Sequence, residues 1–224
     1  MTHPPAVVRL EGPYGHASPI FDHDCILFIS GGVGVALTIG YLEQILREAM
    51  REDIPVETLT KQRVKFVWVV REWSEVQVLR ERLERMREGI AAINQAHIQR
   101  PMEKRGLDVE FEVYITRKPP PVDYTPFSNS SVAGNGGPLP KLVMHTYVRP
   151  AFSSILRDEI TSAGEVHMAS ESKQTSIAVL GCGAAAILDA IRVAVWQEEK
   201  RGRARQGPDE AIVDVDYYEH GYSW

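Results

Sequence analysis

Three glycines near the start of the chain, Gly31, Gly32 and Gly34, directly follow a short apolar run at residues 26–29. Glycine lacks a Cβ atom, so these positions allow positive φ and let a ligand approach bare backbone. A helix predicted to begin near Val35 directs its free N–H groups and the positive end of its dipole to the same point. A strand, a glycine turn and a helix N-terminus together predict an anion site. Glycines placed only for packing give the same pattern, which lacks the full GxGxxG spacing.

A second glycine turn, Gly181-Cys182-Gly183, follows another apolar run at residues 176–181 and precedes a helix predicted at 184–199. In an open parallel sheet both turns lie on one edge, where ligands bind at the switch of strand order. We expect one turn to hold a diphosphate. The second turn, which carries a thiol, would then flank the other end of a dinucleotide. A small residue packed in the core is the alternative for Cys182.

Arg71 stands at the end of a third apolar strand, residues 65–71, where the adenosine ribose of such a ligand would lie. An arginine there favours a 2′-phosphate and hence NADPH, whereas an acidic residue favours a free 2′-hydroxyl. Glu72 stands beside it. A charge-assisted contact between arginine and phosphate contributes about 1.5 to 3 kcal/mol. A surface salt bridge is the alternative for Arg71.

The elements that must position these residues alternate between strand and helix. Continuous apolar strands suit a parallel sheet buried on both faces, and amphipathic helices suit crossovers between its strands. The predicted fold class is therefore α/β, an open parallel sheet flanked by helices on both faces. Residues 109–116 alternate apolar and polar, so this strand is expected to bury one face and lie toward a sheet edge. Further strands are expected at residues 141–148 and 212–218, and further helices at 35–54, 74–100 and 153–163.

Composition excludes several functions. The net charge of −5 does not favour nucleic acid, and two cysteines are too few for a disulfide framework. The sequence has no CxxC pair, no His-Glu spacing typical of a metal site and no GxSxG elbow, so neither a metal site nor serine hydrolysis is predicted.

Six motifs occur in order along the chain. They are EGPYG at residues 11–15, GGVG at 31–34, VWVVRE at 67–72, YVRP at 147–150, LGCG at 180–183 and the aromatic C-terminus YYEHGYSW. Together they resemble the NADPH-binding domain of the ferric-chelate reductase and NADPH oxidase group, part of the ferredoxin-NADP reductase superfamily. The long insertion at about residues 117–141 and the C-terminus look closest to fungal ferric reductases.

The resemblance implies a Rossmann-like NAD(P)-binding domain of ferredoxin-NADP reductase type and a role for each matched residue. Gly31, Gly32 and Gly34 would hold the pyrophosphate, with Gly181 and Gly183 in the second turn. Arg71 and Arg149 would serve the 2′-phosphate and adenosine side. Cys182 would lie against the reacting nicotinamide carbon, and Trp224 would cover the flavin ring. A mobile chain end is the alternative for Trp224. Ala36-Leu37 and Ala184 depart from the family pattern at the two turns.

The same resemblance implies a membrane flavocytochrome metalloreductase that passes hydride from NADPH to FAD and then electrons through haem to ferric or cupric ions. Residues 1–24 would be the last strand of, and the linker from, a missing flavin-binding barrel. Residues 25–224 would form the NAD(P)H-binding domain, with a flexible insertion at about 117–141. The chain, itself soluble, would act at the cytosolic face of a membrane, most readily the plasma membrane, with flavin-binding and transmembrane haem domains as partners.

Two alternatives stay open. The same domain occurs in superoxide-producing NADPH oxidases, and a non-catalytic NAD(P)H-binding module would share its fold. Since FAD and haem would not bind to this chain alone, we expect the isolated chain to be inactive as a reductase.

Overall fold

The computed structural model describes residues 19–50, 62–99, 106–118, 139–168, 174–205 and 212–221. In these segments six strands form one parallel sheet in the order β4-β3-β2-β1-β5-β6. The strands are β1 (Cys25–Gly31), β2 (Gln62–Glu72), β3 (Leu107–Lys118), β4 (Lys141–Thr146), β5 (Gln174–Gly183) and β6 (Ile212–Gly221).

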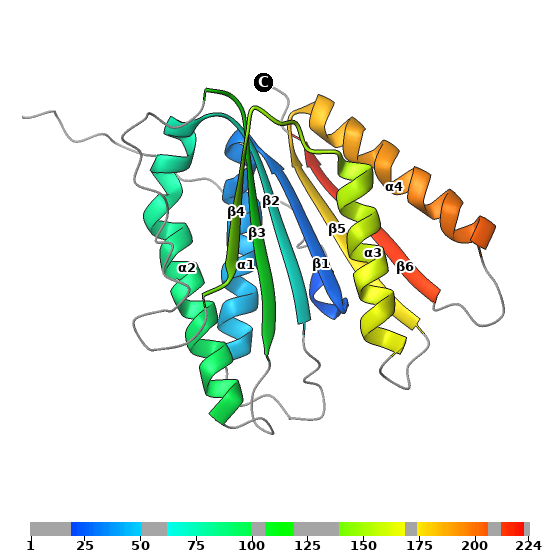
Figure 1. Cartoon of the computed structure of the whole chain (residues 1–224), viewed down its shortest axis with the longest axis horizontal. Coiled ribbons are helices and arrows are strands. Elements are labelled where there is room, and N and C mark those ends of the chain that lie inside the picture. Colours follow the sequence, from blue (N-terminus) through cyan, green and yellow to red (C-terminus); the bar gives the residue numbers. More distant parts are fainter. Residues whose placement is uncertain are drawn as a thin grey trace, which may run out of the picture.

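Within the described segments, four α-helices cover the two faces of the sheet (Figure 1). Helices α1 (Val35–Met50) and α2 (Trp73–Gln99) pack on one face, and α3 (Phe152–Met168) and α4 (Ala185–Arg205) pack on the other. From β1 the chain adds β2, β3 and β4 on one side, and it then returns to place β5 and β6 on the other side of β1. The strand order therefore reverses between β1 and β5.

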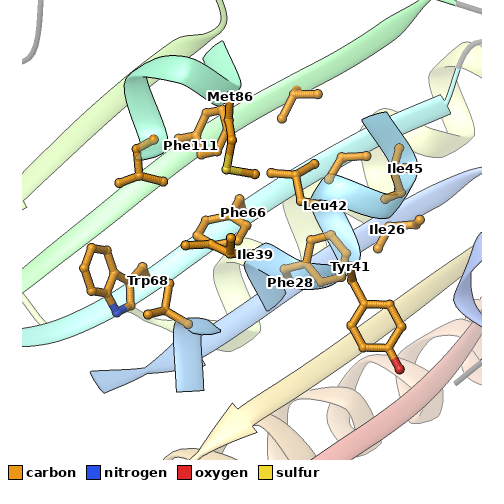
Figure 2. Packing of buried hydrophobic residues seen from close by; sticks show 14 of the residues in the cluster. Ile26, Phe28, Ile39, Tyr41, Leu42, Ile45, Phe66, Trp68, Met86 and Phe111 are labelled. Carbon is orange, nitrogen blue, oxygen red and sulfur yellow. The ribbon is translucent and has the colours of Figure 1, made fainter. Parts of the chain in front are cut away.

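The core under α1 and α2 is built on aromatic side chains from three neighbouring strands (Figure 2). The ring centroids of Phe28 and Phe66 lie 6.1 Å apart, and those of Phe66 and Phe111 lie 5.6 Å apart. Leu42 of α1 and Met86 of α2 close this cluster from above. All seven residues of β1 are buried, which explains its continuous apolar sequence.

The face under α3 carries a charged network beside its apolar cluster. Lys65 Nζ lies 2.8 Å from Glu112 Oε1 and 3.4 Å from Glu159 Oε1. Arg63 Nε lies 2.9 Å from Glu159 Oε2. Burial alone lowers the pKa of Lys65, but the hydrogen bond and charge of Glu112 raise it above its ordinary value. These pairs join β2 and β3 to α3, which supplies Glu159.

The predicted fold class and all the predicted elements within the described residues are confirmed, with bounds that differ by a few residues. The prediction that residues 109–116 bury only one face is wrong. Tyr114 is only 7% exposed and the Glu112 side chain 12%, because β4 flanks β3 and Lys65 neutralises the carboxylates. The ends of the predicted insertion, Arg117, Lys118 and Lys141, belong to β3 and β4. The motif at 11–15 and most of the insertion lie outside the described residues.

Candidate functional site

The two glycine turns lie side by side at the carboxyl ends of β1 and β5. Ser30 and Cys182 are partners in the ladder between these strands. A Cβ atom built on Gly34 would lie 2.5 Å from the carbonyl oxygen of Cys182, and one on Gly183 would lie 3.2 Å from the nitrogen of Gly31. The two backbones therefore pack against each other. Their predicted adjacency is confirmed, at the point where the strand order reverses.

Two of the glycines serve the packing of α4. A Cβ atom on Gly31 would clash with the side chain of Ile187, in the first turn of α4. A Cβ atom on Gly181 would lie 3.1 Å from Tyr217 Oη and 3.2 Å from Leu188 Cδ2. Small residues at these positions let α4 approach the sheet. This supports the alternative in which the glycines of the turns are present for packing. That these glycines also contact a cofactor stays a prediction.

Gly32 differs from the other glycines of its turn. Its φ is +51°, in the left-handed region, and it begins the short 3-10 turn η2 (Gly32–Gly34) that leads into α1. The indole Nε1 of Trp68 donates a 3.0 Å hydrogen bond to the Gly32 carbonyl. Trp68 is 1% exposed, so this bond fixes the turn from inside the core.

Both helices that follow the glycine turns begin at this edge. α1 begins at Val35 and α4 begins at Ala185. The N-terminus of a helix carries unpaired N–H groups and the positive end of the helix dipole. Two such ends beside one pair of turns make the switch point favourable for an anionic ligand.

The two predicted arginines lie at the same edge of the sheet on separate strands. Arg71 is exposed near the end of β2, and Arg149 is exposed just after β4, with β3 between them. Tyr147, which precedes Arg149, has a φ of 60° and donates its N–H to the carbonyl of Ile115 at 2.8 Å. Among the described residues, neither guanidinium forms an ion pair. That these two arginines bind a 2′-phosphate stays a prediction.

The predicted catalytic residues are placed less fully. Cys182 has an exposed fraction of 0%, so its thiol is enclosed within the protein. Contact with a nicotinamide carbon would need local opening of the second turn. Trp224 lies outside the described residues. The assigned roles of both residues stay predictions.

Two residues near the glycine turns, Trp68 and Glu75, were not predicted from the sequence as part of the site. Trp68 lies within the apolar strand predicted at residues 65–71, and nothing in the sequence assigned it to the site. Glu75 accepts hydrogen bonds from the backbone N–H groups of Arg71 and Glu72, at 2.9 and 3.0 Å. Glu75 is the third residue of α2, the position whose glutamate caps the helix in a capping box, but the sequence has Glu72 where that motif has serine or threonine.

A doubly wound parallel sheet with glycine turns at its switch point defines the class of α/β nucleotide-binding domains. A family model described as the ferric reductase NAD binding domain matches residues 23–196, more than half of the chain. The chain therefore belongs to this family and is the NAD(P)H-binding part of a ferric reductase or related oxidase.

A search of curated proteins gives no significant match. Within the described residues, no helix is both long and apolar enough to cross a membrane. The same residues contain no group of three or more side chains placed to hold a metal ion.

Proposed function

We propose that this domain binds NADPH and serves a membrane flavocytochrome metalloreductase. NADPH supplies a hydride, which such a protein passes to FAD before single electrons travel through haem to ferric or cupric ions. The observation that carries the proposal is the contact between the two glycine turns at the switch point, in a chain of the ferric reductase NAD-binding family.

The residues present fit a dinucleotide. The η2 turn leads into the N-terminus of α1, whose positive dipole end favours a pyrophosphate at this place, and Gly32 leaves open space beside it. The second turn lies against the first, so a ligand crossing the switch point meets both. Exposed Arg71 and Arg149 supply positive charge at the same edge for a 2′-phosphate. Cys182 is proposed to face the nicotinamide end and Trp224 the flavin ring.

The flavin-binding and transmembrane haem domains are the proposed partners. The domain would therefore act at the cytosolic face of a membrane, and the plasma membrane is the proposed location. The chain alone is expected to bind the coenzyme weakly and to reduce no metal. Robust ferric reduction by the purified, flavin-free chain would contradict this part of the proposal.

Parallel titrations with NADPH and NADH test the coenzyme assignment, with tryptophan fluorescence as the readout. Arg71→Ala is expected to lower the preference for NADPH by about ten- to a hundredfold, the loss of one charge-assisted contact. Arg85→Ala is the control, because it removes an exposed arginine of α2 that lies about 18 Å from the start of this helix. Equal affinities of the unsubstituted chain for both coenzymes, unchanged in Arg71→Ala, would remove the assigned role of Arg71.

A further inference from the structure

The carboxylate of Glu75 lies between the end of β2 and the first glycine turn. Its Oε1 atom accepts the N–H groups of Arg71 and Glu72 at 2.9 and 3.0 Å. Two backbone donors on one oxygen fix the carboxylate at the start of α2, in the manner of a helix cap. The position of Glu75 is therefore set by the backbone rather than by a flexible side-chain partner.

The second oxygen of Glu75 lies beside Gly32. A Cβ atom built on Gly32 would lie 3.9 Å from Oε2, and apart from Gly32 and its two chain neighbours no other atom of the described residues would lie within 4 Å of it. Within the same residues, Oε2 receives no hydrogen bond. An ionised carboxylate only accepts hydrogen bonds, so this oxygen can take one from a ligand beside the turn.

The place that Oε2 occupies has a known meaning in doubly wound sheets. The adenosine ribose of a dinucleotide lies between the glycine turn after the first strand and the end of the next strand. A carboxylate there accepts a hydrogen bond from the ribose hydroxyls and repels a 2′-phosphate. Glu72 is placed differently, because it is the ladder partner of Lys118 on β3, the strand on the far side of β2 from Gly32.

We propose that Glu75 contacts the adenosine ribose and limits the preference for NADPH over NADH. The inference rests on the proposed function, since it assumes that a dinucleotide occupies the glycine turns. Arg71 and Glu75 then act in opposition from one β2–α2 turn. The guanidinium attracts a 2′-phosphate, while the carboxylate disfavours it and favours the free hydroxyl. The coenzyme preference of the domain is the difference between these two effects.

Glu75→Gln separates the charge of this residue from its capping role. The amide oxygen of glutamine can still accept the two backbone N–H groups, but the negative charge is gone. Isothermal titration of the whole chain with NADPH and with NADH gives the ratio of the two affinities. A general loosening of the turn would weaken the binding of both coenzymes alike, so it would leave the ratio of the two affinities unchanged. Glu88→Gln, at an exposed position about 20 Å further along α2, is the charge-matched control.

We expect Glu75→Gln to shift the affinity ratio toward NADPH by about tenfold, while Glu88→Gln leaves it unchanged. A ratio in Glu75→Gln that equals that of the unsubstituted chain, or that shifts toward NADH, overturns the role of Glu75. If the unsubstituted chain binds neither coenzyme, the proposed function itself is overturned. The two failures are therefore distinguishable within one set of titrations.

Discussion

A methyl group on Gly34 would lie 2.5 Å from the carbonyl oxygen of Cys182, so the two glycine turns are in contact and neither has room for a side chain at this point. Backbone cannot move aside as a flexible side chain can. Gly34→Ala is therefore expected to lower the free energy of unfolding by about 1 to 3 kcal/mol, the usual cost of overpacking. Urea unfolding followed by circular dichroism measures this change.

The control for that substitution is Gly40→Ala in α1. Apart from its chain neighbours and the backbone of its own helix, a Cβ atom on Gly40 meets nothing within 4 Å among the described residues. Alanine inside a helix is more stable than glycine by about 0.5 to 1 kcal/mol, so Gly40→Ala should stabilise the chain. If both variants were equally stable, the close contact between the turns would be disproved.

The hydrogen bond from Trp68 to the Gly32 carbonyl predicts a role for a core residue in ligand binding. Trp68→Phe keeps an aromatic ring but removes the indole donor, so Gly32 loses the bond that fixes its positive φ. We expect NADPH affinity to fall by about three- to tenfold, equivalent to one hydrogen bond. Calorimetric titration measures the affinity.

Phe111→Leu tests whether any core loss has the same effect. Phe111 lies in the same aromatic cluster but belongs to β3, away from the glycine turn. This variant should lose stability while keeping its NADPH affinity. Equal losses of affinity in Trp68→Phe and Phe111→Leu would refute a specific role for the indole.

The charged network on the α3 face predicts a pH dependence of stability. Burial by itself raises the pKa of Glu110, but the hydrogen bond from Lys141 and the charges of Lys65 and Lys141 lower it below its ordinary value. A lowered carboxyl pKa stabilises the folded state above the unfolded pKa of about 4.3, and this contribution is lost as the pH falls through the folded value.

Glu110→Gln should therefore cost about 0.5 to 1 kcal/mol at neutral pH and nothing below the lowered pKa, since Lys141 is exposed to solvent. Thermal unfolding across an acid pH series measures the difference, and Glu81→Gln, an exposed position on α2, is the control. A difference between Glu110→Gln and the unsubstituted chain that persists at low pH would rule out this linkage.

Both cysteines are predicted to resist alkylation in the folded chain. Cys182 has no exposed surface, and burial, with the charge of Glu159 adding to it, raises the pKa of Cys25 to about 11. The thiolate is the reactive form, so iodoacetamide should modify neither residue until urea unfolds the chain. Mass spectrometry of the alkylated protein reports each site. Rapid modification of Cys182 in the folded chain would show that the second turn opens readily.

Most of the fold was predictable because the strands are continuous apolar runs and the helices are amphipathic. The adjacency of the turns at Gly31 and Gly181 followed from parallel topology, in which all carboxyl ends of the strands share an edge. The burial of the second face of β3 was not predictable. The alternating pattern predicts that Glu110 and Glu112 face solvent. Only the pairing of β2 with β3 brings Lys65 beside them.

The parts of the site that depend on side-chain direction were also hidden in the sequence. Trp68 lies in an apolar strand, where nothing marks its indole as the donor to Gly32. Glu75 follows Glu72 by three residues, without the serine or threonine of a capping box, and its approach to Gly32 depends on how β1 and β2 pair. Contact with a ligand and packing in the core were both open for Cys182, and only its position in the ladder beside Ser30 shows that its side chain is buried.

The central claim, that the two glycine turns together bind one coenzyme, is tested most directly by nuclear magnetic resonance of the isotopically labelled chain during titration with NADPH. The account predicts that the backbone amide signals of residues 31–34 and of residues 182–183 shift together, with one shared affinity. Shifts confined to another part of the sheet, or signals from both turns that stay unchanged at saturation, would contradict it.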